Sequence, residues 1–344
     1  MTAQTEVVSN AKPKLKHGIV VIDKPAGMTS HDVVSIARRL FWTKRVGHTG
    51  TLDPDATGVL VLCLGQATRL AEYLSASRKH YVTEVRFGIE TDTQDASGTT
   101  TSECNASHLT ADLVSELLPR FRGAIQQVPP MVSALHYEGK RLYELARQGV
   151  TVERAARNIE IDALEMTAFS HGIQPKATLE VTCSTGTYIR TLAADIGAAA
   201  GTGAIMQTLR RTWVGDTKNH FALEDAHTLD DLHRRADAGT IWEIVLPPAA
   251  ALSGWIQLTA DTEQLARLRN GQPLSLMNIP ITSWRNLPDS FDFSASINAP
   301  IDANDIDVKE ATRVALLDDA GEIAAIARFD FEAGQLRPIK VFAA

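Results

Sequence analysis

The chain has 344 residues, of which 44% are hydrophobic and 22% are charged, and it carries a formal net charge of −7. This length exceeds one ordinary domain and suits two, and the composition is that of a globular protein with a sizeable buried core. The apolar run at residues 58–65 spans less than half of the roughly 18 residues that a membrane-spanning helix needs, so we expect no transmembrane segment.

The first 16 residues, MTAQTEVVSNAKPKLK, are polar and contain three lysines. They lack the apolar centre of a signal peptide, so we expect a disordered tail and a cytoplasmic protein. Cys63, Cys104 and Cys183 are isolated, and no CxxC pair is present. This spacing indicates neither a disulfide framework nor a zinc site, and inert thiols in a reducing compartment account for it.

Predicted strands and helices alternate along the chain from His17 onward. Apolar stretches bounded by turn residues predict strands at 18–23, 58–64, 80–88 and 176–183. Apolar positions at helical spacing, together with capping residues, predict helices that begin near Ser30, Ala67, Thr110 and Tyr188. The strand at 80–88 should bury every second side chain, namely Tyr81, Thr83, Val85 and Phe87. We therefore expect a mixed α/β architecture.

Two later segments differ from this core in composition and in the length of their predicted elements. Residues 136–161, HYEGKRLYELARQGVTVERAARNIEI, are rich in Arg and Lys and predict a helix and a strand that project from the core; we call residues 131–162 the clamp. From about Trp255 short strands and tight turns follow, with hairpin connections at 318–322 and 331–335. The patterns predict a larger domain at 17–250 and a small β-rich domain at 251–344.

The stretch GHTGTLDPDATG at 47–58 places Asp53 inside a turn rich in Gly and Thr. An Asp before Pro is most often a turn former, and such a turn is most often structural or a phosphate nest. A glycosidase pair with Asp55 is disfavoured, because residues two apart on an extended turn point in different directions. A phosphate loop is excluded, because no Lys follows Gly47 or Gly50 at the required spacing. The local pattern thus leaves the role of Asp53 open.

Four ordered stretches give that turn a context: DKPAGMTSHD (23–32), GHTGTLDPDATG (47–58), KHYVTEVRFGIETDTQD (79–95) and GTYIRTLAADIG (186–197). Together with LRR at 209–211 they resemble the TruB family, the bacterial tRNA pseudouridine-55 synthases, from about His17 to Arg211. The resemblance implies a pseudouridine synthase-like catalytic domain at 17–250, with a mixed antiparallel sheet and flanking helices. It also implies a PUA-like RNA-binding domain at 251–344 and an isomerase that needs no cofactor and no metal.

The resemblance also implies roles for individual residues. Asp53 matches the essential aspartate, which attacks the sugar, removes a sugar proton or adds to the uracil. Arg190 pairs with this carboxylate, and Tyr81 stacks on a flipped base. The remaining positions expected to bind substrate or shape its pocket are His48, Tyr188, Leu209, Asp95 and Lys24. Phosphate contacts are expected from Arg141, Arg147, Arg154 and Arg157 of the clamp and from Arg210 and Arg211 beside the pocket.

The charge distribution fits an RNA partner despite the negative total. Residues 1–80 contain 11 Lys and Arg against 6 Asp and Glu, a local charge of +5, whereas residues 255–344 contain 8 against 13, a local charge of −5. We expect a monomeric enzyme that acts on the T-arm of tRNA without a guide RNA. Two alternatives stay open: an RNA-binding protein that helps tRNA fold, and a guide-RNA-dependent synthase that resembles dyskerin. The clamp and the acidic C-terminal end favour the stand-alone enzyme.

Overall fold

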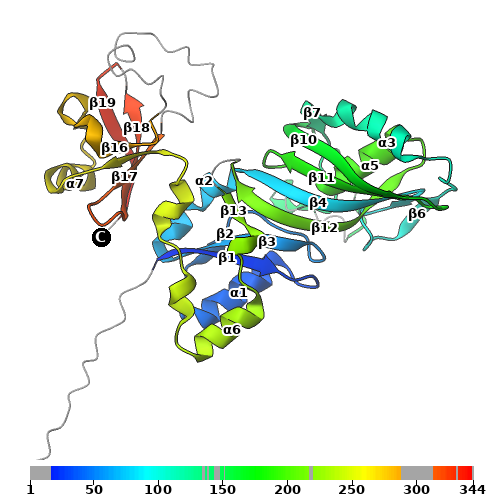
Figure 1. Cartoon of the computed structure of the whole chain (residues 1–344), viewed down its shortest axis with the longest axis horizontal. Coiled ribbons are helices and arrows are strands. Elements are labelled where there is room, and N and C mark those ends of the chain that lie inside the picture. Colours follow the sequence, from blue (N-terminus) through cyan, green and yellow to red (C-terminus); the bar gives the residue numbers. More distant parts are fainter. Residues whose placement is uncertain are drawn as a thin grey trace, which may run out of the picture.

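The computed structural model describes residues 17–133, 136–137, 139–142, 148–150, 152–216, 220–287, 313–330 and 332–342. A long mixed sheet forms the larger part of the molecule, and a smaller β-rich unit lies at one end of it (Figure 1). In this described part, no helix combines the length and the apolar character that a membrane crossing requires.

Within the described residues the large sheet has nine strands, and seven of them follow the order β1-β3-β12-β4-β11-β10-β7. β2 pairs with β3, and β13 pairs with β12. β12 runs parallel to β3, whereas its pairing with β4 is antiparallel. The strands are β1 (Gly18–Lys24), β2 (Val46–His48), β3 (Thr57–Leu64), β4 (Arg78–Phe87), β7 (Gly123–Gln127), β10 (Arg157–Ser170), β11 (Lys176–Cys183), β12 (Ala204–Gly215) and β13 (His220–Ala222). The expected mixed, largely antiparallel sheet is confirmed.

Helices cover the two ends of this sheet separately. At one end α1 (Ser30–Leu40) contacts β2 and α6 (Leu229–Asp237) contacts β1. At the other end α3 (Ala111–Leu117) contacts β10, and α5 (Ile189–Ala199) contacts β12 and β4 (Figure 1). α1 begins where the sequence predicts, because Thr29 and Asp32 form a capping box. Its apolar side then packs in one cluster with residues of β1 and β3.

The helix expected at 67–76 is only partly correct. A 3₁₀ helix occupies Gly65–Leu70, and α2 (Ala71–Ser75) adds little more than one α-helical turn. The Thr68 hydroxyl donates a hydrogen bond of 2.7 Å to the carbonyl of Gly65, a local contact that competes with regular helical bonding.

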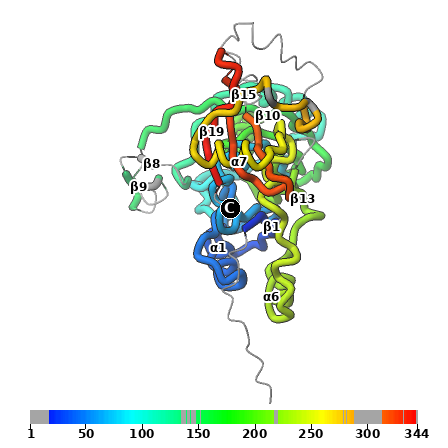
Figure 2. The backbone as a smooth tube through the Cα atoms, turned by 90° about the vertical axis from the view of Figure 1, so that its left-hand side faces the viewer, coloured from blue at the N-terminus to red at the C-terminus, as the bar shows by residue number. Residues whose placement is uncertain are grey.

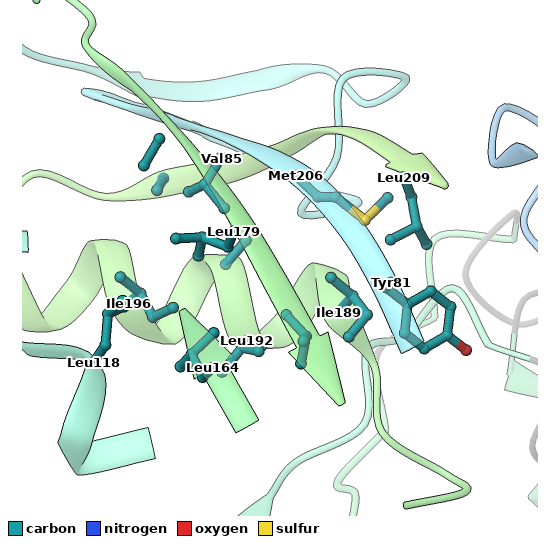
Figure 3. Packing of buried hydrophobic residues seen from close by; sticks show 14 of the residues in the cluster. Tyr81, Val85, Leu118, Leu164, Leu179, Ile189, Leu192, Ile196, Met206 and Leu209 are labelled. Carbon is teal, nitrogen blue, oxygen red and sulfur yellow. The ribbon is translucent and has the colours of Figure 1, made fainter. Parts of the chain in front are cut away.

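β4 has the predicted alternation, and its buried face includes Tyr81, Val85 and Phe87. These side chains pack against α5 in one apolar cluster with Leu179 and Leu192. In Figure 3 the Tyr81 ring lies at the edge of the labelled cluster, and its hydroxyl points away from the apolar side chains. The sheet and α5 therefore form a rigid support under the phenol ring.

The β-rich unit is a six-stranded sheet in the order β15-β19-β18-β17-β14-β16 within the described residues. Its elements are β14 (Ile256–Thr259), α7 (Thr262–Arg269), β15 (Leu274–Ser275), β16 (Trp284–Arg285), β17 (Arg313–Leu317), β18 (Ile323–Asp330) and β19 (Gln335–Val341). β17, β18 and β19 form consecutive antiparallel pairs, so the hairpins expected near 318–322 and 331–335 are confirmed. The exact domain boundary near residue 250 stays a prediction.

The two parts of the fold share an apolar core. Val21 and Val61 of the large sheet belong to the same buried cluster as Ala315 and Ile326 of the small one. Arg69 adds a polar link, since its Nη1 donates to the carbonyl of Val341 at 2.6 Å. Continuous apolar packing at such a junction favours a fixed orientation of the two sheets.

Two short hairpins complete the described structure. β5 (Ile89–Thr91) pairs with β6 (Thr100–Glu103), and β8 (His136–Tyr137) pairs with β9 (Lys140–Arg141). Figure 2 shows β8 and β9 at the margin of the molecule, to one side of the large sheet. They belong to the clamp, whereas the helix expected within the clamp lies outside the described residues.

Candidate active site

Two buried cations, Lys24 and Arg211, donate hydrogen bonds to the backbone of the loop at 47–58, which connects β2 to β3. Lys24 donates from Nζ to the carbonyls of Pro25 at 2.8 Å and Pro54 at 2.9 Å. The guanidinium of Arg211 donates to three carbonyls of the loop and of the following strand: Val59 at 2.7 Å, Gly50 at 3.0 Å and Thr51 at 3.5 Å. Because both cations are almost fully excluded from solvent, their hydrogen bonds hold the loop backbone in one conformation.

Two further contacts fix the same loop. Ser30, at the start of α1, accepts from the Leu52 amide at 2.9 Å and donates to the Leu52 carbonyl at 3.2 Å. Gly58 has φ +102°, and a Cβ there would lie 2.1 Å from the carbonyl oxygen of Arg211. Only glycine allows the start of β3 to pair with β12 this closely. The backbone on both sides of Asp53 is therefore anchored.

The structure brings Asp53, Arg190 and Asp95 together. Nε of Arg190 lies 3.0 Å from Oδ2 of Asp53, and Nη2 lies 3.3 Å from Oδ1. This two-point pairing orients the carboxylate as well as neutralising it. Oδ2 of Asp95 lies 3.7 Å from Nε on the same guanidinium. The Arg190 side chain is 5% exposed and that of Asp53 is 36% exposed, so the carboxylate is the part of the pair that a substrate can reach.

Arg190 is itself held at the first turn of α5. It donates to the carbonyls of Thr93 at 3.2 Å and Val132 at 2.8 Å. The helix start is fixed by Gln127, whose side-chain amide accepts from the Tyr188 amide at 2.8 Å and donates to its carbonyl at 3.1 Å. Residues from three distant segments thus converge on one guanidinium.

A pocket of about 230 Å³ opens beside this pair. This volume is below the range of about 300–1,000 Å³ that drug-sized ligands occupy, and it suits a single base. Tyr81 lies opposite Arg211 and Thr83 lies opposite Leu209 across β4 and β12, so all four side chains share one face of the sheet. The pocket lining includes Asp53, Lys79, Tyr81, Tyr188, Ile189, Arg190, Leu209 and Arg211.

Burial is the largest influence on the pKa values of Asp53, Tyr81, Lys24 and Lys79. It raises the pKa of Asp53 above the ordinary 3.8, with the Arg190 charge opposing the rise and Asp95 adding to it. Arg190 favours the ionised carboxylate as expected, but desolvation is the larger effect. Burial also raises the pKa of Tyr81, against the opposing influence of Arg211, so its hydroxyl is neutral near pH 7. Burial lowers the pKa of both Lys24 and Lys79 to about 8.

The raised pKa of Asp53 predicts a pH dependence. If the ionised carboxylate is required, turnover should fall on acidification with an apparent pKa above 3.8. Because the pKa is raised on folding, the protonated form adds stability that is fully present below the unfolded pKa and lost as pH rises through the folded pKa. Acid loss of activity through Asp53 is thus not itself unfolding. Single-turnover rates and unfolding midpoints over the same pH series measure the two separately, and an acid limb at or below 3.8 would contradict the expectation.

The other expected pocket residues lie near this centre. Nδ1 of His48 accepts from the Gly50 amide at 3.3 Å, and burial lowers the pKa of its imidazole, so the ring is neutral near pH 7. Tyr188 is partly buried at the N-terminus of α5, and Leu209 is buried in the pocket wall. Lys24 supports the loop backbone, in agreement with a shaping role.

The arginines expected on the RNA surface have different positions. Arg157 is exposed at the start of β10, and Arg154 is half-buried with no hydrogen-bond partner for its Nε among the described residues. The side chain of Arg141 and all of Arg147 lie outside the described residues. Arg210 is partly exposed and pairs with Asp23 at 2.8 Å.

Arg211, which was expected to contact RNA phosphates beside the pocket, is instead occupied within the fold. Its side chain faces the inner side of β12, where it is 1% exposed and bonded to three carbonyls. Two residues at the candidate site were also not predicted from the sequence. Lys79, which lines the pocket, could have been found as a charged residue on the buried face of an alternating strand. Gln127 carries no such signal, because its contact with Tyr188 is purely tertiary.

Among the described residues, no group of three or more His, Cys, Asp or Glu side chains is arranged to hold a metal ion.

Comparison with known proteins adds to this geometry. Residues 38–189 match the family model of the TruB family pseudouridylate synthase N-terminal domain, and residues 190–253 match that of the tRNA pseudouridylate synthase B C-terminal domain. The chain is 48% identical to tRNA pseudouridine synthase B of Symbiobacterium thermophilum, over 78% of this chain and 85% of that protein. The protein of the same name from Dehalococcoides mccartyi is 45% identical, over 76% of this chain and 84% of its own length.

Solved structures share the fold at much lower identity. An H/ACA RNP bound to a substrate RNA containing 2'-deoxyuridine aligns with a TM-score of 0.66 and 21% identity, over 95% of this chain and 85% of that chain. A Cbf5-Nop10-Gar1 complex aligns with a TM-score of 0.66 and 22% identity, over 95% of this chain and 84% of that one. The pseudouridine synthase-like fold is therefore shown independently of the sequence relatives.

Proposed function

Because the chain belongs to the TruB family of pseudouridylate synthases, we propose that it converts uridine 55 in the T-loop of tRNA to pseudouridine, as a stand-alone enzyme. The observation that carries this proposal is the two-point pair of Asp53 with Arg190, at 3.0 Å and 3.3 Å, beside a pocket of single-base size. The reaction is an isomerisation within one nucleotide. It requires a base-sized pocket and an aimed carboxylate, and the site has both features.

In this reaction the uridine leaves the T-loop stack and enters the pocket against Tyr81. Asp53 acts as a nucleophile on the sugar, as a base on the sugar or as a nucleophile on the uracil, and the bond between N1 and C1′ breaks. The uracil turns, C5 bonds to C1′, and the proton on C5 is lost while N1 gains one. A bond that Asp53 has formed to the sugar or to the uracil breaks again before the product leaves, and a proton that it has taken from the sugar returns there. Arg190 holds the carboxylate in place through these steps. The neutral Tyr81 hydroxyl is available to exchange a proton with the base.

Recognition of the RNA would combine shape with phosphate contacts. The neutral ring of His48, at the edge of the catalytic loop, is suited to fill the space that the flipped base leaves. Arg157 and Arg154 of the clamp offer cations for phosphate contacts. The charge of Arg157 opposes the rise in the pKa of Tyr188, which lines the pocket. The T-arm of tRNA is the partner that we propose for this surface.

The stand-alone mode is favoured by the relatives at 45–48% identity, which are named tRNA pseudouridine synthase B. The H/ACA particles share the fold at 21–23% identity, which carries no argument for a guide RNA. A monomer in the cytoplasm is part of the same proposal. A role in tRNA folding is compatible with the pocket but needs none of its chemistry.

The deciding experiment uses the purified chain and an unmodified tRNA transcript, with no guide RNA added and with base-resolved detection of pseudouridine. We expect product at the T-loop uridine alone, and none in a matched transcript that carries cytidine at that position. Product at a different uridine would contradict the assigned site. Absence of product until a guide RNA is supplied would contradict the stand-alone mode. Accelerated tRNA folding without product would favour the chaperone alternative.

A further inference from the structure

The turn between α1 and β2 has a composition that the fold does not explain. Residues 38–45 read RRLFWTKR, with four cations and no acidic residue; we call this segment the basic turn. Trp42 lies at its centre with φ +51°, and its side chain is 93% exposed. The neighbouring Phe41 is buried and packs edge-on against Trp242. Only one of the two adjacent aromatic rings therefore contributes to the core.

The backbone at Trp42 is unfavourable for its residue type. A positive φ near +50° favours Gly, Asn or Asp and is strained for a bulky side chain. An indole that is 93% exposed offsets almost none of this strain through burial. The left-handed conformation itself ends α1, because the amides of Trp42 and Thr43 donate to the carbonyls of Arg39 at 3.3 Å and Arg38 at 3.2 Å. What the fold leaves unexplained is an exposed indole at this position, where Gly or Asn is usual.

The cations of the basic turn are not neutralised by neighbours. Arg39, Lys44 and Arg45 are exposed and Arg38 is half-buried. No carboxylate of the described residues lies within 4.0 Å of any of the four. Arg38 instead donates from Nη2 to the carbonyl of Val46 at 3.4 Å, and its Nε has no partner among the described residues. The basic turn thus combines unpaired positive charge with an exposed aromatic face.

The basic turn lies well away from the pocket. Val46 pairs with Leu64 at the far end of β3, whereas Thr57 begins β3 just after Asp53. Seven residue steps of about 3.3 Å place these two ends of β3 roughly 23 Å apart. Since β2 connects the basic turn to His48, both lie on one continuous segment.

We propose that the basic turn is a second RNA-binding surface, on which Trp42 stacks against an unpaired nucleotide of the tRNA outside the T-loop while the surrounding cations contact its phosphates. Single-stranded nucleic acid is bound by this combination of an aromatic platform and a positive groove. A base inside an RNA duplex cannot offer its face, so the partner nucleotide is unpaired. The choice of tRNA as the ligand rests on the proposed function.

Two substitutions distinguish the contribution of the aromatic ring to tRNA binding from the effect of the positive φ at residue 42. Trp42→Asn removes the indole and suits the positive φ, whereas Trp42→Phe keeps an aromatic face. Stacking of one base contributes about 1–3 kcal/mol, so Trp42→Asn should weaken tRNA binding by about 5- to 150-fold. Trp42→Phe should retain most of the affinity. The turnover rate at saturating tRNA should not change for either variant, because the pocket is untouched.

A salt titration tests the cations by an independent measurement. Lys44→Ala and Arg45→Ala should each reduce the slope of log affinity against log salt by about one unit. The melting midpoint of Trp42→Asn should equal or exceed that of the wild type, since the strained backbone is relieved. A loss of affinity then cannot be ascribed to unfolding.

If Trp42→Asn binds tRNA as tightly as the wild type, the proposal is wrong, and the basic turn does not bind RNA through Trp42. An equal loss in Trp42→Phe and Trp42→Asn would overturn the stacking role. Failure of the proposed function remains distinguishable, because it would alter the position of pseudouridine in the wild-type product and not the affinity difference between the Trp42 variants.

Discussion

Asp53→Asn should reduce single-turnover formation of pseudouridine by at least about a thousandfold, because an amide of nearly the same volume can act neither as nucleophile nor as base. The affinity for tRNA should stay within about threefold of the wild type. The reason is that the loop carrying Asp53 is anchored by Lys24, Ser30 and Arg211, and none of these contacts uses the Asp53 side chain. Turnover with enzyme in excess and filter retention of labelled tRNA measure both quantities on one preparation.

The stability of Asp53→Asn should differ little from that of the wild type. Burial raises the pKa of Asp53, so its ionised form costs stability at neutral pH and the amide removes this cost. Arg190 loses one counter-ion, but it keeps Asp95 at 3.7 Å and the carbonyls of Thr93 and Val132. These two effects oppose each other, and the unfolding midpoint measures their balance.

Asp55→Asn is the matched control, since Asp55 is exposed on the same loop, and it should turn over at the wild-type rate. A residual rate of Asp53→Asn within about tenfold of the wild type corresponds to a barrier change of only about 1.4 kcal/mol. That outcome would remove Asp53 from the chemistry. Loss of binding together with turnover would instead identify the loop at 47–58 as an RNA-docking element.

Local patterns of the sequence predicted much of the fold. The alternation in β4 indicated which face is buried, and the helical spacing after Ser30 indicated the start of α1, where the N-cap is Thr29, one residue before the cap expected at Ser30. Both signals act within a few neighbouring residues. The pairing of Asp53 with Arg190 was not available from spacing, since 137 positions separate the two. It followed only from the ordered motifs that the family resemblance supplied.

Other features depend on tertiary contacts that no local pattern encodes. The role of Gln127 arises where the end of β7 meets the start of α5, 61 positions away. Both Arg210 and Arg211 were expected to contact RNA phosphates, although adjacent residues of a strand point to opposite faces. Alternation alone shows that one of the pair must turn inward, and the register of β12 against β4 identifies it as Arg211.

The contrast between these neighbours gives the second large effect that we expect. Arg211→Met should lower the free energy of unfolding by about 3 kcal/mol, because it removes a buried guanidinium that donates to two carbonyls of the loop and one of β3. The loop would then no longer hold Asp53 against Arg190, and turnover should fall as well. The substitution also removes the cation that opposes the rise in the pKa of Tyr81. Arg211→Lys should recover little, since one ammonium cannot reach carbonyls spread along the loop.

Arg210→Met is the control at the adjacent position. Its partner Asp23 lies at 2.8 Å in a pair that is 41% and 27% exposed, so the stability cost should stay below about 1 kcal/mol. Urea unfolding of both variants, with single-turnover assays below the unfolding transition, measures the difference. A stability loss in Arg211→Met no larger than in Arg210→Met would show that the hydrogen bonds to the loop contribute little. A stable Arg211→Met protein with full turnover would further show that the loop conformation does not depend on this arginine, and the positioning of Asp53 would then rest on Lys24 and Ser30.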